Sequence, residues 1–359
     1  MDYVVILAGG SGTRLWPISR LKKPKQSGYF FDKKTLLQIT YDRISKGFSK
    51  ENIFVSCGKS QLDLLKKQLP NVSSNNFIVE PVARGTAMAI GLACVKISSY
   101  DKNANVIIAN ADHFVRPDDK YISLLKKASK LISKYGEYLC LVGIKPTYPE
   151  IGYGYIEVSN QFNGLELVYD IKKFKEKPNF EIAKKYFKSS KFLWNTGWFI
   201  FNPNTMLSLF EKHLPKQFKA LKSIEQNINT DNYNKVLEKE FKNLESISID
   251  YGIIEKTKKM FVIKSNIEWY DIGSWSAVKD CFSKNSKDNL EDGNVLSFDS
   301  CDNLIINKNK NKLISIIGMS EFVIVDTEDA LLICPKDKSQ EVKKIIDTLK
   351  LNKKLNKYL

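Results

Sequence analysis

The chain has 359 residues, of which 43% are hydrophobic, the composition of a globular protein long enough for one large domain and a smaller one. The net charge is +16, but the lysines are spread along the whole length, so we interpret them as solvated surface and expect no nucleic-acid partner. No apolar run reaches the roughly 18 residues of a membrane helix, and the first residues lack the basic segment of a signal peptide. We therefore expect a cytoplasmic protein without membrane contact. The six cysteines form no CxxC pair and there are two histidines, which argues against a zinc site.

Strand and helix patterns alternate through the first two thirds of the chain. Short apolar or β-branched runs predict strands over 4–7, 53–56, 77–79, 106–109 and 138–143. Helical periodicity predicts helices over 35–46, 59–68, 86–99 and 120–135. This alternation favours an α/β domain with a mainly parallel sheet, and ligands of such sheets collect at the carboxyl ends of the strands.

The last quarter of the chain has a different pattern. Short strand-like runs recur about every ten residues, and a helix follows over 339–350. Residues 283–289 read as a polar linker, so we predict a catalytic domain over 1–287 and a small β-rich, β-helix-like domain over 288–359. This second domain is also a candidate surface for a homodimer.

The segment ILAGGSGTRLWPISR at residues 6–20 follows the first predicted strand directly. Its glycines allow backbone N–H groups to approach an anion, and Arg14 and Lys25 supply the positive charges that a polyphosphate needs. The segment has leucine where a dinucleotide-binding loop needs its third glycine, and it lacks the Gly-Lys-Ser/Thr of a P-loop. It is therefore a phosphate-binding loop of a third kind.

Two aspartates are candidate metal ligands. Asp112 follows the predicted strand 106–109, and Asp271 lies between aromatic residues and Gly273. Taken singly, each also fits a capping or turn residue. Together they could hold Mg²⁺, which prefers oxygen ligands.

Three further segments have the residue types of a substrate site. Lys177 precedes Pro178, which favours an extended backbone for Lys177 and suits a phosphate contact, although a surface lysine is the alternative. In EPVARGTA (80–87), a carboxylate and an arginine could read a guanine edge, or Thr86 could simply cap a helix. The segments 153–157 and 194–198 contain glycines such as Gly197, an asparagine, and aromatic residues such as Tyr153. This combination is typical of a sugar-binding site.

In nine ordered motifs, the chain resembles the bacterial mannose-1-phosphate guanylyltransferase (GDP-mannose pyrophosphorylase) family. They are LAGGSGTRLWPISR, PKQ, EPVARGTA, NADH, GYGYIEV, FKEKP, WNTGWFIF, SIDYGIIEKT and WYDIGSW. The resemblance spans nearly the whole chain. It implies a Rossmann-like nucleotidyltransferase domain that transfers GMP from GTP to mannose 1-phosphate with Mg²⁺, giving GDP-mannose and pyrophosphate. It also implies the short form of the family, without an isomerase domain.

The resemblance implies a role for each matching residue. The nucleotide contacts would be Leu7, Ala8, Gly9, Gly10, Ser11, Gly12, Thr13, Arg14, Lys25, Glu80, Arg84, Thr86 and Asp112. The sugar-phosphate contacts would be Gly154, Glu176, Lys177 and Asn195, to which the residue pattern adds Tyr153 and Gly197. The metal ligands would be Asp112 and Asp271, and the catalytic group Arg14, Lys25, Asp112, Lys177 and Asp271.

The chain departs from the family pattern at three positions. Gly85 stands where asparagine is usual, Asn110 where proline is usual, and Trp198 where methionine is usual. We expect Gly85 and Trp198 to bear on base and sugar selectivity. The alternatives are a guanylyltransferase for another sugar 1-phosphate, such as a manno-heptose 1-phosphate, and a catalytically silent regulatory relative.

Overall fold

The structure, a computed structural model, describes residues 1–10, 12–21, 23–30, 34–285 and 287–359. Contacts between residues group the chain into two compact units. The first unit consists of Met1–Gly9, Tyr41–Asn110 and Val115–Trp269, and the second of Gly10–Thr40, Ala111–Phe114 and Tyr270–Leu359. The glycine-rich loop therefore groups with the C-terminal part of the chain, which lies more than 250 residues further on.

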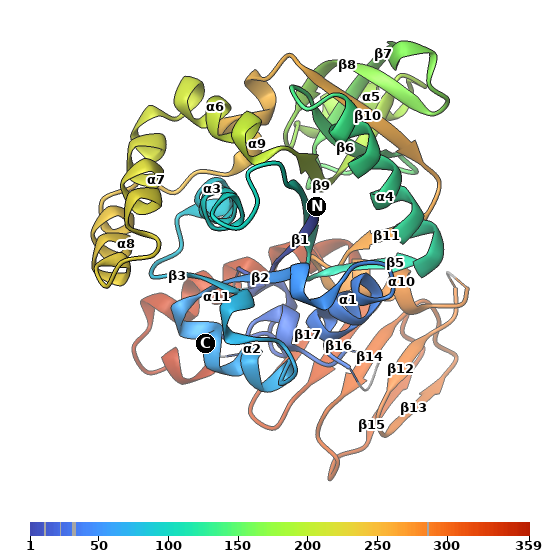
Figure 1. Cartoon of the computed structure of the whole chain (residues 1–359). Coiled ribbons are helices and arrows are strands. Elements are labelled where there is room, and N and C mark those ends of the chain that lie inside the picture. The colour runs from blue at the N-terminus through green and yellow to red at the C-terminus, as the bar shows by residue number, and fades with distance from the viewer. Residues whose placement is uncertain (11, 22, 31–33, 286) are drawn as a thin grey trace. The chain divides into compact units, whose positions relative to one another are not determined.

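The first unit is built on a mixed sheet with the strand order β3-β2-β1-β4-β9-β6-β10-β8-β7 in the described part of the chain (Figure 1). Its strands are β1 (Asp2–Leu7), β2 (Ile53–Gly58), β3 (Phe77–Glu80), β4 (Asn105–Asn110), β6 (Leu139–Ile144), β7 (Tyr155–Gln161), β8 (Val168–Lys175), β9 (Phe192–Phe201) and β10 (Met260–Ser265). Parallel pairs join β1 to β2 and β4, β2 to β3, and β6 to β10. Strand β9 is antiparallel to β4 and β6. The α/β class and the mixed sheet are thus confirmed: the pairs among β1 to β4 and the pair of β6 with β10 are parallel, and every pair formed by β7, β8 or β9 is antiparallel.

The first four helices begin within a few residues of the predicted positions, and five further helices follow in the described part of the first unit. They are α1 (Leu36–Ser45, which starts in the second unit), α2 (Leu62–Gln68), α3 (Gly85–Ser98), α4 (Asp118–Lys134), α5 (Phe180–Phe187), α6 (Pro203–His213), α7 (Pro215–Asn227), α8 (Tyr233–Lys242) and α9 (Ile249–Gly252). Nearly every side of α3 is apolar and buried, because the helix lies between the sheet and the helices α6 and α7. Such a helix has no polar face and reads as core.

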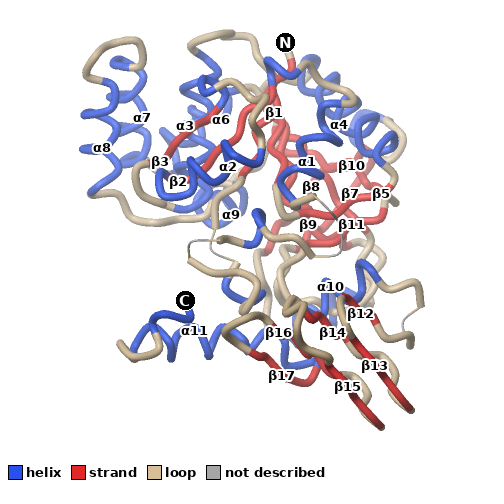
Figure 2. Tube along the Cα trace, turned by 90° about the horizontal axis from the view of Figure 1, so that it is seen from below, coloured by secondary structure: helices blue, strands red, loops and turns tan. Residues whose placement is uncertain are grey.

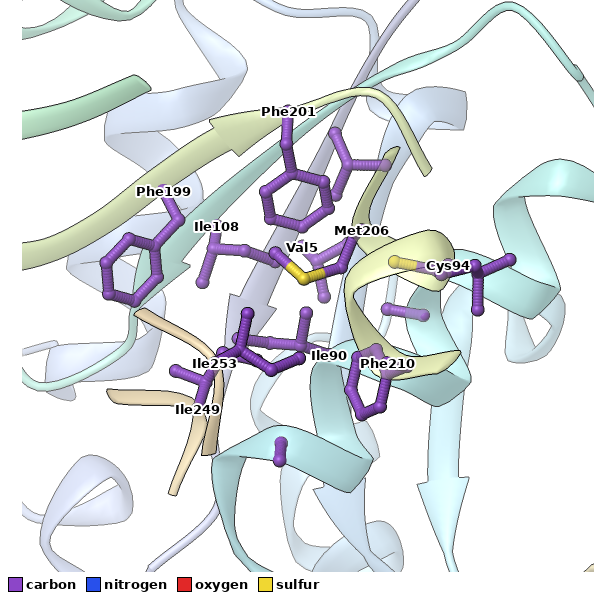
Figure 3. Packing of buried hydrophobic residues seen from close by; sticks show 14 of the residues in the cluster. Val5, Ile90, Cys94, Ile108, Phe199, Phe201, Met206, Phe210, Ile249 and Ile253 are labelled. Atoms are coloured by element: carbon purple, nitrogen blue, oxygen red, sulfur yellow. The ribbon is translucent and has the colours of Figure 1, made fainter. Parts of the chain in front are cut away.

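The core of the first unit is visible in Figure 3. Val5, Ile108 and Phe201 from the strands face Ile90 of α3 and Met206 of α6, and all five side chains are fully buried. No helix in the described part of the chain is both long and apolar enough to cross a membrane.

The C-terminal part of the second unit has short strands that lie side by side (Figure 2). The strands β12 (Leu290–Asp292), β14 (Leu304–Asn307), β16 (Phe322–Asp326) and β17 (Leu331–Pro335) form one sheet, and β13 (Val295–Phe298) pairs with β15 (Ile314–Ile317). Parallel pairing of β12, β14 and β16 confirms the β-rich, β-helix-like character. The buried side chain of Asn303 donates to Met319 O (2.7 Å) and accepts from Phe322 N (2.9 Å), so buried amides help to hold the turns between successive coils.

Two helices and one two-stranded sheet complete the described chain, apart from its short 3-10 helices. The helices are α10 (Trp275–Phe282) and α11 (Val342–Leu351), and β5 (His113–Arg116) pairs with β11 (Glu268–Asp271). Apolar side chains of the 10–40 segment, including Leu15 and Phe30, pack with Trp275 and with the inner face of β14 and β16.

Trp198 of β9 is a core residue. Its side chain is 0% exposed and its ring centroid lies 4.7 Å from that of Tyr121 in α4. We expect Trp198→Met to lower the free energy of unfolding by about 1–3 kcal/mol, because the smaller side chain leaves a cavity. Urea unfolding measures this, with Phe180→Met at a half-exposed position as the control. Equal stability of the two variants would contradict the core assignment.

Candidate functional site

The predicted phosphate loop begins where β1 ends. Leu7, Ala8 and Gly9 belong to the first unit, and Gly10, Gly12, Thr13 and Arg14 to the second, while Ser11 lies outside the described residues. Gly12 has φ 57° and leads into the 3-10 helix η1 (Thr13–Leu15). A side chain at Gly12 would collide with the side chain of Lys25, so the loop needs a glycine there. Arg14 is exposed to solvent.

The segment after the loop is anchored within the second unit. The Trp275 indole donates to Trp16 O (2.9 Å), and the Trp16 indole donates to Tyr358 O (2.8 Å). The Arg20 guanidinium also donates to Tyr358 O and pairs with Asp329 Oδ1 at 2.7 Å. Residues close to the phosphate loop are therefore fixed by side chains and carbonyls from the far end of the sequence.

Lys25 lies between the two predicted metal ligands. Its Nζ is 2.5 Å from Asp112 Oδ2 and 3.7 Å from Asp271 Oδ1, and it donates to Ile272 O (3.3 Å). The Lys25 side chain is 13% exposed. Burial lowers the pKa of Lys25, but the two carboxylates more than offset this and raise it. Burial raises the pKa of Asp112, whereas Lys25 and His113 lower it, and the net direction is downward. Both groups are therefore charged at neutral pH.

This arrangement fits a divalent cation. Donor atoms of Asp112, His113 and Asp271 all lie within 4.8 Å of one another. Asp271 Oδ1 is buried and has no hydrogen-bond partner among the described residues, so it is available to a ligand. Two carboxylates form a hard oxygen donor set. Sequence reasoning missed His113, although it directly follows Asp112; its Nε2 is 3.9 Å from Asp112 Oδ1.

A second group of predicted residues meets inside the first unit. Asn195 N donates to Gly154 O (2.8 Å), and Gly197 N donates to Asn195 Oδ1 (3.2 Å). Glu176 is 7% exposed, and its Oε1 pairs with Lys177 Nζ at 3.0 Å. Tyr153 directly precedes Gly154, and its ring centroid lies 5.4 Å from that of Trp194 and 5.0 Å from that of Trp269. The group combines an ammonium for a phosphate with acceptors and aromatic rings for a sugar.

The expected extended backbone of Lys177 is wrong. Lys177 has φ 42°, in the left-handed region that side-chain-bearing residues rarely adopt. The preceding carboxylate explains part of this, because the turn lets Lys177 Nζ reach Glu176 Oε1. A strained residue held by its neighbours is typical of a ligand-binding position.

The EPVARGTA segment follows β3 and opens α3. Glu80 is 6% exposed, and its Oε2 has no hydrogen-bond partner among the described residues. Burial raises the pKa of Glu80 to about 7. Arg84 donates to Phe241 O (2.7 Å) and Lys242 O (2.5 Å) at the end of α8. Its guanidinium is thus engaged with backbone carbonyls inside the first unit.

Thr86 and Gly85 are also engaged with a distant segment. The helix cap is Arg84 rather than Thr86, and Thr86 Oγ1 accepts a hydrogen bond from Ile249 N (2.9 Å). Gly85 has φ 79°, and a side chain there would collide with Ile247 O. Asparagine, the usual residue in the family, is the other residue type that tolerates positive φ. Gly85 therefore meets a backbone requirement.

Glu80 gives a pH-dependent prediction. Its folded pKa of about 7 lies above the ordinary value of 4.5, so the folded chain holds a proton that the unfolded chain releases. Stability from this group is complete below pH 4.5 and is lost as the pH rises to 7 and beyond, by up to about 3 kcal/mol. Glu80→Gln should remove this slope. Urea unfolding between pH 4 and 8 tests it, with exposed Glu245→Gln as the control; parallel curves for Glu80→Gln and the wild type would refute the buried proton.

Comparisons with known proteins show to which family the chain belongs. A family model described as Nucleotidyl transferase matches residues 3–288, and one described as MannoseP isomerase/GMP-like beta-helix domain matches residues 293–349. The mannose-1-phosphate guanylyltransferase RfbM of Salmonella typhimurium is 36% identical over 97% of this chain and 72% of its own length. The alginate biosynthesis protein AlgA of Pseudomonas aeruginosa is 33% identical over 96% of this chain and 71% of its own length.

A solved structure gives the same assignment of fold. The Thermus thermophilus protein described as mannose-1-phosphate geranyltransferase has a TM-score of 0.86 and 29% identity, and the match covers 97% of this chain and 99% of that one. The family model covers well over half of this chain, and the curated relatives exceed 30% identity over more than two thirds of their length. The chain therefore belongs to the nucleotidyl transferase family and, within it, to the mannose-1-phosphate guanylyltransferases.

Proposed function

We propose that the chain transfers GMP from GTP to mannose 1-phosphate, releasing pyrophosphate and forming GDP-mannose. The observation that carries the proposal is the contact of Lys25 with Asp112 and Asp271. This contact brings the Lys25 ammonium, which follows the phosphate loop, together with two carboxylates that could hold a metal ion. The relatives of this chain are named for the proposed activity.

Asp112 and Asp271 are the residues that would hold Mg²⁺, which supplies positive charge to phosphoryl oxygens when bound. Arg14 and Lys25 then neutralise the charge that develops on the departing pyrophosphate. Lys177 binds the phosphate of the sugar 1-phosphate as a compact point charge. Glu80 offers its orphaned buried oxygen to the N–H donors of the guanine edge, which removes an unsatisfied acceptor from the interior.

The reaction needs no general base. A phosphate monoester has its second pKa near 6, so its oxygen is already an anionic nucleophile at neutral pH. That oxygen attacks the α-phosphorus of GTP in line with the leaving pyrophosphate. The chain's contribution is then to hold both reactants in line and to neutralise charge.

Pyrophosphate release over a grid of nucleotides and sugar 1-phosphates tests the proposal. We expect turnover to peak with GTP and mannose 1-phosphate, in the presence of Mg²⁺. Highest turnover with manno-heptose 1-phosphate would show that the proposed sugar substrate is wrong. Highest turnover with a nucleotide other than GTP would show that the proposed base is wrong. Binding of GTP without turnover for any sugar would instead indicate a regulatory protein.

The metal ligands give a separate prediction. We expect Asp112→Asn and Asp271→Asn each to lower kcat by on the order of 10²–10³-fold, because each removes one charge from the transition-state site. Each variant should also bind Mn²⁺ more weakly, as measured by water-proton relaxation. Asp231→Asn on the exposed surface is the matched control. Wild-type metal binding in both variants would refute the assignment.

A further inference from the structure

Asp250 lies beside the group formed by Gly154, Glu176, Lys177 and Asn195. Asn195 Nδ2 donates to Asp250 Oδ1 at 3.4 Å. The charges of Glu176 and Lys177 both act on the pKa of the Asp250 carboxyl. Asp250 comes from the SIDYG segment, more than fifty residues after Asn195, and neither the sequence pattern nor the family resemblance gave this residue a role.

The start of α3 fixes the position of Asp250. Ile247 N donates to Arg84 O (3.2 Å), and Ala87 N donates to Ile247 O (3.2 Å). Thr86 Oγ1 then accepts from Ile249 N (2.9 Å), the residue directly before Asp250. These bonds hold the 247–249 backbone from one side, and the positive φ of Gly85 permits the close approach.

The charges around Asp250 suit a hydroxyl group better than a phosphate. The ammonium of Lys177, the phosphate contact of the proposed function, pairs with Glu176, whereas Asp250 forms no ion pair within the described ranges. Burial, followed by the charge of Glu176, raises the pKa of Asp250 to about 7. A carboxylate oxygen repels a phosphate but accepts a hydrogen bond from a hydroxyl, and a sugar 1-phosphate carries both groups.

Glu255 supports the same arrangement from behind. Its Oε1 accepts from Glu176 N (2.9 Å) and lies 3.4 Å from Lys175 Nζ. Glu255 is thereby used to hold the Glu176 backbone, whereas the Asp250 carboxyl receives one amide hydrogen of Asn195 at the long distance of 3.4 Å. Of these two acidic residues of the SIDYGIIEKT segment, Asp250 is the one with acceptor capacity left for a ligand.

We infer that Asp250 accepts a hydrogen bond from a hydroxyl group of the sugar and determines sugar specificity, and that Thr86 is a positioning residue for it. This inference rests on the proposed function and names a further residue of the same substrate site.

A double-mutant cycle between Asp250 and each sugar hydroxyl tests the inference. The kcat/KM of the wild type and of Asp250→Ala is measured with mannose 1-phosphate and with its 2-, 3-, 4- and 6-deoxy analogues, at saturating GTP. Removing the recognised hydroxyl should lower wild-type kcat/KM by roughly 10- to 100-fold, the value of one hydrogen bond to a charged group. The same analogue should lose nothing further in Asp250→Ala. The KM for GTP should change less than about twofold.

Four variants separate recognition from loss of structure. Asp250→Asn keeps the shape but changes the acceptor, and exposed Asp231→Asn is the matched control. Thr86→Val should weaken the coupling between Asp250 and the recognised hydroxyl, and Thr86→Ser should restore this coupling because the hydroxyl returns. A purely structural role of Thr86 would lower kcat/KM for mannose 1-phosphate and for every deoxy analogue by the same factor and would leave the coupling unchanged.

The outcomes distinguish this inference from the proposed function. An active wild type in which no deoxy analogue couples to Asp250 overturns the inference and leaves the proposed function standing. A wild type without turnover for any sugar 1-phosphate overturns the proposed function and, with it, the inference. Coupling to one hydroxyl of a different sugar keeps Asp250 as the recognition residue and corrects the substrate.

Discussion

The ion pair between Lys25 and Asp112 is the interaction on which the site of the second unit depends. It joins two separate pieces of sequence, the 10–40 segment and the 111–114 segment, and Asp271 adds the third. A buried lysine is stable only when it is paired, so the ammonium and the carboxylates fix one another's positions. One ammonium facing two carboxylates leaves one negative charge uncompensated, and a cation that takes carboxylate oxygens as ligands would compensate it.

In the first unit, the polar side chains of the candidate sugar-phosphate site lie at the edge of an apolar core, and that core holds them in place. Helix α3 is buried on nearly all sides, so its orientation is set by packing against the sheet and α6. Its N-terminal residues then hold the 247–249 backbone through Thr86 and Arg84. The buried helix therefore fixes the position of the backbone just before Asp250, the residue that accepts a hydrogen bond from Asn195. Precise placement of substrate groups requires such support.

Much of the fold could be predicted from local patterns, whereas the partners of the site residues could not. The strands at 4–7 and 106–109 and the helix at 86–99 are local apolar runs, and they form as expected. Arg84 and Thr86, in contrast, bond to residues about 160 positions away, and Trp16 bonds to a carbonyl more than 300 positions away. The hydrophobic periodicity of a sequence predicts local helices and strands and does not indicate contacts between residues so far apart in the chain. The domain boundary at 287/288 and the substrate roles of the residues remain predictions.

Two of the three departures from the family pattern meet requirements of backbone conformation and packing in the first unit. Gly85 adopts a positive φ, which asparagine also tolerates. Trp198 packs in the core against Tyr121. Both positions therefore act on backbone conformation and packing, and their bearing on base and sugar selectivity stays a prediction. Discrimination between bases or sugars requires polar groups with unused hydrogen-bonding capacity, since a buried donor or acceptor rejects an analogue that leaves it unpaired. In the first unit Glu80 and Asp250 have that capacity, so selectivity should follow these two carboxyl groups.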